Sequence, residues 1–434
     1  MKRILLVLVG CLPLVAYCQL QVADRVKQKA KQRAERHVDN AIDKSMDKAE
    51  EEISNEVKKQ PSTDKDVSQP AQKNSQPAQA GGGGLKSYSR YDFIPGERIV
   101  FATDFTGDAI GELPVNWTTD NRGETVSVEN RKGQWLRLFP NSRFASPAVQ
   151  KLPENFTLEA DILIAYNGGE GYVYPEVEIK LLDLLPGKER LNSYVINQDA
   201  SNEVSLALAP GGTGSPIKVL LKSFAKGSSY FNNQPKELNA VIGKNGVSFH
   251  LAVWVQKERI RYWINQDKIF DIPQAVPSEA RFNHIGFSVE SSLYTDDQLG
   301  IYVTNLKVAE GTPDVRNKLI TEGRMETNGI LFDVASDWIK PESAGVLKEI
   351  ASVLKSNPSL SIRIIGHTDT DGDAAANLEL SKKRSAAVKN TLSTDFGIEP
   401  NRMQTDGLGE TRPVSENKTS EGKAKNRRVE FVRL

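Results

Sequence analysis

The sequence has few of the residues that form covalent or metal cross-links. Its 434 residues include 2 cysteines, Cys11 and Cys18, and 4 histidines that are scattered along the chain. If the segment that holds both cysteines is removed, neither a disulfide nor a thiolate metal site can form in the remainder. The histidines have no spacing typical of metal ligands, so we expect no metal site and no cofactor.

Long apolar runs and an excess of charge are also missing. Outside residues 4–15, no stretch approaches the roughly 20 apolar residues that a transmembrane helix needs. Lys and Arg number 56, as do Asp and Glu. A chain with balanced charge has no overall field that favours nucleic acid, so no nucleic-acid partner is expected. The hydrophobic fraction of 38% is low for one uniform globule of this length and indicates several domains joined by polar linkers.

Residues 1–18 have the pattern of a signal peptide. Two basic residues precede the apolar run 4–15, and Ala16-Tyr17-Cys18 follows it. Lipidation is the alternative. Cys11 follows Leu8-Val9-Gly10, which has lipobox chemistry but a short apolar segment ahead of it, and Cys18 follows Tyr17 where a small residue is usual. Either pattern predicts export, and we expect the chain in the periplasm or at the outer membrane.

Two polar segments follow. Residues 19–59 are charged and contain no Gly or Pro, and small apolar residues recur at every third or fourth position. This pattern predicts a solvated helix, and self-association as a coiled coil is the alternative. Residues 60–90 are rich in Gln, Pro, Ser, Lys and Ala and include four consecutive glycines. They are predicted to be a disordered, flexible linker.

Short β-rich runs follow one another over residues 91–311, separated by turn residues such as Asn245-Gly246. The runs are 100–105, 125–129, 135–139, 156–165, 175–182, 204–209, 217–222, 247–256, 259–264, 284–289 and 300–309. Helical periodicity is nearly absent, which predicts an all-β domain of sandwich or barrel type. Residues 156–162 and 260–265 resemble the concanavalin A-like, laminin G-type jelly roll, and this resemblance implies a jelly-roll sandwich.

Two pairs of carboxylates on this domain have the i, i+2 spacing that places both on one strand face. They are Glu159 with Asp161, and Glu176 with Glu178. Such pairs can act as acid and base in glycoside hydrolysis, but neither matches the longer acidic ladder of lectin-fold hydrolases. An exposed strand face, with Lys180 beside Glu176 and Glu178, is the simpler interpretation. Binding of a glycan or of an envelope protein by this domain stays open.

The last hundred residues alternate strand and helix patterns. Predicted strands at 329–332, 361–365, 403–408 and 428–432 and helices from Pro341 and over 374–392 give a two-layer α/β domain, with a short helical turn at 420–425. Arg384 falls on the same helix face as Leu380, Val388 and Leu392. An inward-facing guanidinium needs a partner, and Asp369, at the exit of the central strand, is the candidate. A purely structural ion pair and a ligand site both fit this pattern.

Several motifs of this region occur in order. Gly366-His367-Thr368-Asp369-x-x-Gly372 precedes Asn377-x-x-Leu380-Ser381-x-x-Arg384, and Gly407-x-Gly409-Glu410 and Asn426-Arg427-Arg428-Val429-Glu430 follow. Together they resemble the OmpA-like peptidoglycan-binding domain, over about residues 326–434. The resemblance implies that Asp369 and Arg384 bind diaminopimelate of the stem peptide, that Thr368, Asn377 and Leu380 belong to the same site, and that His367 fixes the loop. Ala335 stands where the family has an acidic residue, so a ligand contact there is in doubt unless Asp333 substitutes.

The chemistry of the ligand fits the two charged residues. Diaminopimelate carries an ammonium and a carboxylate at its side-chain end, which a carboxylate and a guanidinium can bind together. The site has no nucleophile paired with a base, so binding rather than catalysis is expected. The sequence thus predicts a non-catalytic envelope protein that binds peptidoglycan and links the wall to the outer membrane or to a partner. An envelope carbohydrate-active enzyme or lectin that uses the C-terminal domain as an anchor is the alternative.

Overall fold

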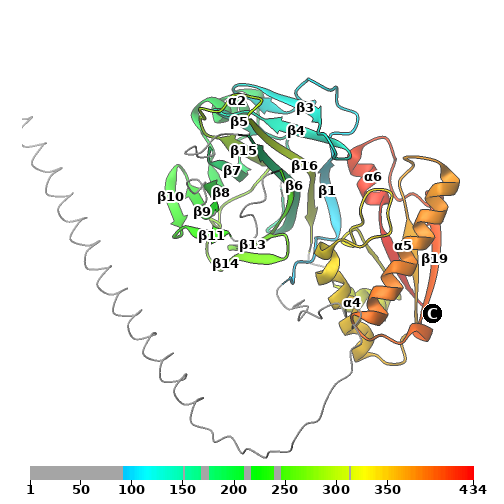
Figure 1. Cartoon of the computed structure of the whole chain (residues 1–434). Coiled ribbons are helices and arrows are strands. Elements are labelled where there is room, and N and C mark those ends of the chain that lie inside the picture. The colour runs from blue at the N-terminus through cyan, green and yellow to red at the C-terminus, as the bar shows by residue number, and fades with distance from the viewer. Residues whose placement is uncertain (1–90, 150–151, 168–174, 210–216, 239–245, 312–313) are drawn as a thin grey trace, which may run out of the picture. The chain divides into compact units, whose positions relative to one another are not determined.

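The computed structural model describes residues 91–149, 152–167, 175–209, 217–238, 246–311 and 314–434 (Figure 1). The predicted signal peptide (1–18), charged helix (19–59) and linker (60–90) lie outside the described residues. Residues 91–434 fall within one compact unit, Gly83–Leu434. In the part of the chain that is described, no helix is long and apolar enough to cross a membrane.

Two eight-stranded antiparallel sheets make up most of the described chain. The first sheet has the order β14-β13-β12-β6-β16-β4-β3, with β1 paired to β16. Its strands are β1 Arg98–Thr103, β3 Gly123–Ser127, β4 Gln134–Leu138, β6 Asn155–Tyr166, β12 Phe249–Gln256, β13 Arg259–Ile264, β14 Asp267–Ile272 and β16 Leu299–Glu310. The second sheet has the order β10-β9-β8-β7-β15-β5-β2, with β11 paired to β9. Its strands are β2 Thr118–Thr119, β5 Ser142–Ala145, β7 Val177–Asp183, β8 Asn202–Ala209, β9 Ile217–Ala225, β10 Ser228–Asn232, β11 Lys236–Leu238 and β15 His284–Val289.

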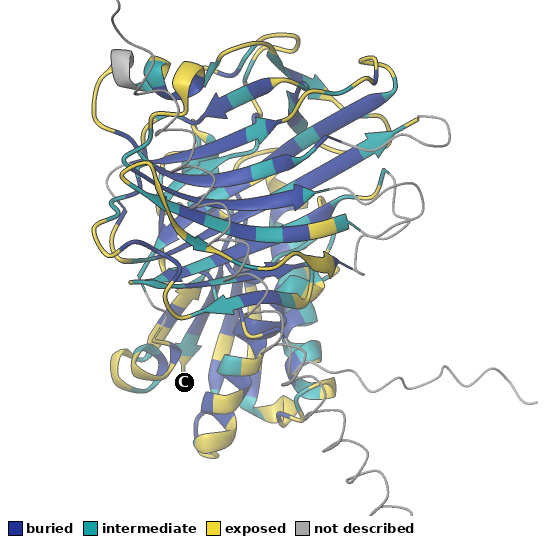
Figure 2. Ribbon diagram, turned by 90° about the vertical axis from the view of Figure 1, so that its left-hand side faces the viewer, coloured by how far each residue is buried: buried dark blue, intermediate teal, exposed yellow. Residues whose placement is uncertain are grey.

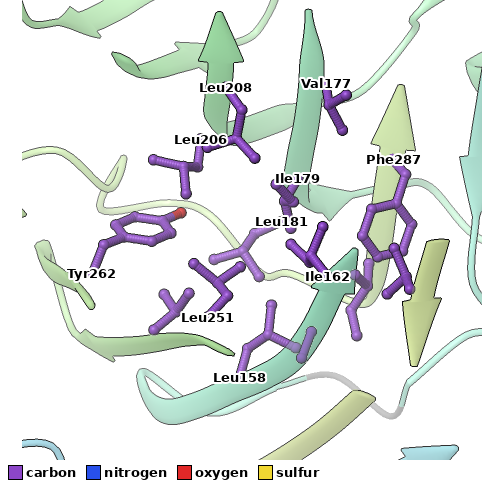
Figure 3. Packing of buried hydrophobic residues seen from close by; sticks show 14 of the residues in the cluster. Leu158, Ile162, Val177, Ile179, Leu181, Leu206, Leu208, Leu251, Tyr262 and Phe287 are labelled. Carbon is purple, nitrogen blue, oxygen red and sulfur yellow. The ribbon is translucent and has the colours of Figure 1, made fainter. Parts of the chain in front are cut away.

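Alternate residues of both sheets point into a shared hydrophobic core, as the two-residue period of a strand dictates. Leu158 and Ile162 of β6 meet Ile179 and Leu181 of β7 and Phe287 of β15 in this core (Figure 3). Strands near the middle of the sheets, such as β6 and β8, are buried at most positions, because their outer faces are also covered (Figure 2). The two sheets therefore form a sandwich, and each of the predicted β-rich runs overlaps one of its strands.

Several elements of the sandwich were not predicted. They are the strands β2, β5, β10, β11 and β14 and the helix α2, Lys188–Asn197. The helix is short, and its apolar residues at helical spacing are limited to Leu191, Tyr194 and Val195, which is too little for the sequence to indicate a helix on its own. It packs on the outer face of the second sheet, where Tyr194 and Val195 contact Leu182 and Leu184. Tertiary contacts therefore stabilise α2.

A four-stranded sheet with the order β17-β20-β18-β19 forms the C-terminal α/β domain (Figure 1). Strand β18 runs parallel to β19 and antiparallel to β20. The strands are β17 Arg324–Thr327, β18 Ile362–His367, β19 Met403–Gly409 and β20 Val429–Arg433, and the main helices are α4 Ala344–Ser356, α5 Ala374–Thr394 and α6 Ser420–Asn426. A hydrophobic core separate from that of the sandwich includes Ile350, Ile362, Val388 and Phe431. The predicted α/β class is confirmed.

The first strand of this domain differs from the prediction. Residues 329–332 are not a strand, and β17 lies earlier, at Arg324–Thr327. The chain leaves the sheet at Asn328, whose side-chain amide donates to the carbonyl oxygens of Ala424 and Arg427, at 2.8 and 2.7 Å. A Cβ at Gly329 would lie 2.5 Å from Pro95. The backbone turns here because the amide captures the neighbouring carbonyls and glycine permits the close approach.

The buried face of α5 also differs from the prediction. The buried side chains are those of Asn377, Ser381, Ser385, Val388 and Leu392, whereas Leu380 and Arg384 are only half-buried. The helix lies very close to the sheet, since a Cβ at Gly366 would be 2.3 Å from the Ser381 carbonyl oxygen. Small residues on both sides allow this approach, so the serines face the sheet and Arg384 lies at the edge of the helix–sheet contact.

The segment before β1 connects the sandwich to the α/β domain. Tyr91 and Phe93 pack on Trp263 and Ala252 of the first sheet and on Ala344 at the start of α4. A Cβ at Gly345 would lie 2.0 Å from the Phe93 carbonyl oxygen. Part of the outer face of the first sheet is therefore covered by this segment and by the C-terminal domain.

Candidate functional site

Asp369 lies just beyond the C-terminal end of β18. The preceding residues are fixed by backbone hydrogen bonds, from His367 N to Arg428 O and from Thr368 N to Gly409 O, both 3.0 Å. Asp369 as a whole residue is 7% exposed. It accepts a hydrogen bond from the Asp371 backbone amide at 3.2 Å and pairs with Arg427 Nη1 at 2.6 Å. A nearly buried carboxylate is thus held by two donors just beyond the C-terminal end of an inner strand of the sheet.

Arg384 lies on α5 with its guanidinium over the Phe332 ring, 4.8 Å from the ring centroid. Its Nε donates to the Ser336 carbonyl oxygen at 3.0 Å, and its Nη2 donates to that of Asp333 at 3.3 Å. Burial lowers the pKa of Arg384, and the charge of Asp369 opposes that change. The guanidinium therefore lies within electrostatic reach of Asp369.

The predicted ion pair between Asp369 and Arg384 is not formed. Within the described chain no salt bridge joins the two side chains, and Asp369 pairs with Arg427 instead. The physical reason is the shifted face of α5, which places Arg384 beside the loop 333–338, where backbone carbonyls accept its hydrogen bonds. The guanidinium meets its need for acceptors without a carboxylate.

The loop 333–338 contains Ala335, the position at which the family resemblance implies an acidic residue. Ala335 adopts a left-handed backbone conformation, with φ of 54°. Asp333 N donates to Trp338 O at 3.2 Å, which closes the loop. Asp333 contacts Arg384 through its backbone carbonyl. The loop therefore positions Arg384 through main-chain atoms.

The other predicted site residues, Thr368, Asn377 and Leu380, lie in three different environments. Asn377 is 6% exposed and its side-chain amide donates to Glu410 Oε2 at 2.8 Å and to the carbonyl oxygens of Asp369 and Asp371. Thr368 is buried, and its hydroxyl has no hydrogen-bond partner among the described residues. Leu380 is half-buried on α5. Asn377 thus holds the loop that carries Asp369.

His367 acts as a buried hydrogen-bonding residue, as the sequence predicted. Its Nε2 lies 3.2 Å from Glu430 Oε2. Burial, aided by the nearby Arg428, lowers the pKa of His367, although Glu430 opposes the shift. The imidazole is therefore neutral at pH 7 and supports the strand exit that carries Asp369.

Arg427 was missed as a site residue. It belongs to the motif Asn426-Arg427-Arg428, where nothing distinguishes one arginine from the other. The structure separates them, because Arg428 is buried and pairs with Glu326 at 3.0 Å, while Arg427 is exposed and pairs with Asp369. The strand pattern that follows could have distinguished the two arginines, because consecutive residues entering β20 point to opposite faces of the sheet.

The acidic pairs of the sandwich are engaged in ion pairs. Glu159 lies 3.0 Å from Lys307 Nζ, and Asp161 lies 2.7 Å from His250 Nδ1. Burial would raise the pKa of Glu178, but Lys180 outweighs it and lowers the value to about 2. A carboxyl of that pKa stays ionised and is not a general acid at neutral pH.

The face that carries Glu178 is not the exposed face that the sequence predicted. Lys180 is 3% exposed and pairs with Glu178 and Glu203, at 2.9 and 3.0 Å. The helix α2 packs on this outer face of the second sheet, so the charges were buried by an element that the sequence did not indicate. Among the described residues, no group of three or more His, Cys, Asp or Glu side chains is arranged to hold a metal ion.

Comparison with known proteins identifies the C-terminal domain. Residues 331–427 match the OmpA family. "Probable lipoprotein YiaD" of Escherichia coli (strain K12) is 42% identical over 105 residues, 24% of this chain and 48% of the relative. "Outer membrane protein A" of Bordetella avium is 41% identical over 100 residues, 23% of this chain and 51% of the relative.

A solved structure, the peptidoglycan-associated lipoprotein from Burkholderia pseudomallei, is 33% identical, with 24% of this chain and 88% of that chain covered and a TM-score of 0.23. The chain spans about half the length of the two curated relatives named above. Each of these matches covers only about a quarter of this chain. The chain therefore carries an OmpA family domain at residues 331–427.

Proposed function

We propose that this chain is a non-catalytic protein of the cell envelope that binds peptidoglycan through its C-terminal domain. The ligand is the diaminopimelate of the stem peptide, whose ammonium and carboxylate are bound by Asp369 and Arg384. Two relatives are named as a lipoprotein and an outer membrane protein, which supports a location in the periplasm or at the outer membrane. The protein then connects the wall to the outer membrane or to an envelope partner.

One observation carries this proposal. Asp369 and Arg384 come from a strand exit and from the adjacent helix, and they influence each other electrostatically without forming a salt bridge. Two opposite charges that are close but not joined can each take one charge of a zwitterionic ligand. The Asp369 loop is held by Asn377 and the Arg384 guanidinium by backbone carbonyls, so little ordering is needed when the ligand binds.

Sedimentation of the full chain with purified sacculi tests the proposal. We expect Asp369→Ala and Arg384→Ala each to reduce the bound fraction to background, because each removes one of the two charges. Lys383→Ala is the matched control, since Lys383 is the exposed neighbour of Arg384 on α5, and it should bind as the unmodified chain does. Retained sedimentation by both site variants would refute the assignment, provided that circular dichroism shows both to be folded.

The β-sandwich supplies the second contact in this proposal, as a concanavalin A-like domain that binds a glycan or an envelope protein. Part of the outer face of the first sheet is covered by the segment 91–94 and by α4, so a partner is expected at the second sheet or at the loops. Self-association through residues 19–59 remains part of the proposal. Light scattering of the chain with and without that segment measures the number of chains per particle. If that number is the same for both, the segment does not mediate self-association.

A further inference from the structure

The loop after β1 brings a carboxylate of the sandwich to the site of the C-terminal domain. Asp104 Oδ2 lies 3.9 Å from Arg427 Nη2. Asp104 Oδ1 accepts hydrogen bonds from Ser420 Oγ at 2.9 Å, and from the backbone amide of Thr106 at 3.1 Å. Ser420 begins α6, so the sandwich and the C-terminal domain together fix the orientation of this carboxylate.

Arg427 therefore stands between two carboxylates. It pairs directly with Asp369 at 2.6 Å, whereas its distance to Asp104 is about 1 Å longer than a charge-assisted hydrogen bond. The Arg427 side chain is 40% exposed, against 10% for Asp369 and 23% for Asp104. The guanidinium is the most exposed of the three groups and is carried by a long side chain with rotatable bonds, so a small displacement exchanges one carboxylate for the other.

A ligand ammonium competes with Arg427 for Asp369. The carboxylate already carries one cation, and a second cation nearby would be repelled unless the first moves away. Arg384 adds a third positive charge to the same region, and the two guanidinium groups repel each other. An Arg427 guanidinium without a carboxylate partner is therefore unfavourable there. Arg427 thus needs another acceptor when the ammonium arrives.

We propose that Asp104 is a positioning residue of the wall-binding site and receives the Arg427 guanidinium when the ligand ammonium displaces it from Asp369. This inference rests on the proposed function and extends it, because the sandwich then takes part in wall binding through a named residue. No bond is made or broken in the exchange. The sandwich determines how readily Asp369 becomes free for the ligand.

Titration calorimetry of the full chain with a soluble muropeptide that contains diaminopimelate tests the exchange. We expect Asp104→Asn to weaken binding about tenfold, the loss of one charge-assisted contact, because Arg427 then stays on Asp369. Arg427→Gln should bind the muropeptide more tightly than the unmodified chain does, because it removes the competing cation. Glu237 is an exposed carboxylate on β11 of the same sandwich. The matched control Glu237→Gln should therefore leave the affinity for the muropeptide unchanged.

The double variant Asp104→Asn with Arg427→Gln separates positioning from a merely structural role. If Asp104 acts through Arg427, the Asp104 substitution has no effect once Arg427 is gone. An equal loss of affinity in both backgrounds would overturn the inference, and so would unchanged affinity of the single Asp104→Asn variant. Failure of the unmodified chain to bind the muropeptide is a different result, because it refutes the proposed function itself.

Discussion

At the scale of residues, the site depends on how the Arg384 guanidinium distributes its donors. Two of its nitrogens donate to the carbonyl oxygens of Ser336 and Asp333, and Phe332 lies under the planar group. Arginine has five N–H donors in a fixed plane, so donors remain for a ligand carboxylate after the two internal bonds are made. A single ammonium cannot reproduce this arrangement.

Replacing Arg384 by lysine tests that geometry. We expect Arg384→Lys to weaken muropeptide binding by about tenfold or more, since at least one hydrogen bond to a charged group is lost. Titration calorimetry of the full chain measures the change, and Lys383→Arg on the same helix serves as the control. Equal affinity of the lysine variant would show that only the positive charge matters.

At the scale of elements, the close contact between α5 and the sheet determines which face of the helix is buried. Gly366 of β18 and Gly407 of β19 lie against the backbone and side chain of Ser381 and the backbone of Lys382. Ser381 Oγ accepts a hydrogen bond from Gly409 N at 2.9 Å, which satisfies a buried donor. Small residues here thus position the helix that carries Arg384.

A methyl group at Gly366 should disturb this contact. Its Cβ would lie 2.3 Å from the Ser381 carbonyl oxygen, so the helix must move. We expect Gly366→Ala to lower the free energy of unfolding by about 1–3 kcal/mol, the usual cost of overpacking, and to weaken muropeptide binding because Arg384 moves with α5. Urea unfolding followed by circular dichroism measures the stability.

The exposed Thr370 provides the control, since Thr370→Ala changes a residue of the same segment without a backbone clash. If Gly366→Ala were as stable as the unmodified chain, α5 would not be in close contact with β18. If only binding fell, the helix would adjust without loss of packing energy, contrary to the expectation.

At the scale of the whole molecule, a largely buried polar cluster of His250, Asp161 and Glu159 lies on the outer face of the first sheet. His250 Nδ1 is 2.7 Å from Asp161, and its Nε2 is 3.7 Å from Glu159. Burial lowers the pKa of His250, but the two carboxylates outweigh it and raise the value to about 10. Lys340 of the C-terminal domain is among the charges that lower the pKa of Asp161. The cluster is therefore sensitive to both domains.

The raised pKa predicts how stability depends on pH. The folded protein keeps the His250 proton at pH values where the unfolded chain, with a pKa of about 6.5, has lost it. This contribution is complete below about pH 6.5 and disappears as the pH rises toward 10. We expect the stability difference between the unmodified chain and His250→Gln to shrink between pH 7 and pH 9. The limiting slope is about 1.4 kcal/mol per pH unit.

Urea unfolding at a series of pH values measures this slope. His284→Gln is the matched control, because burial lowers the pKa of His284 to about 4. The contribution of neutral His284 to stability is therefore lost only as the pH falls below about 6.5. The fall in unfolding free energy between pH 7 and pH 9 should thus persist in the His284→Gln variant. If the difference in free energy of unfolding between the unmodified chain and His250→Gln were the same at pH 7 and pH 9, the raised pKa of His250 would be contradicted.

Local patterns were sufficient for much of this fold. The β-rich runs predicted strands such as β6, β12 and β16, because short apolar, β-branched and aromatic runs bounded by turn residues are visible in the sequence itself. The strand–turn–helix order around Asp369 was also predictable, from the strand pattern at 361–365 and the helix pattern over 374–392, which overlap β18 and α5. Patterns of this kind fail where the contact is not local. The helix α2 and the strand β17 illustrate this, since both depend on neighbours distant in the chain.

The sequence by itself determined that Asp369 follows a strand, that Arg384 lies on the next helix, and that a β-rich domain precedes them. Only the tertiary structure decided that Asp369 pairs with Arg427, that carbonyls of residues 333–338 hold Arg384, and that Asp104 of the sandwich lies beside the site. The reason is physical. Periodicity fixes which way a side chain points from its own element, whereas ion-pair partners depend on helix placement and sheet order, which small residues such as Gly366 and Ser381 set through close packing.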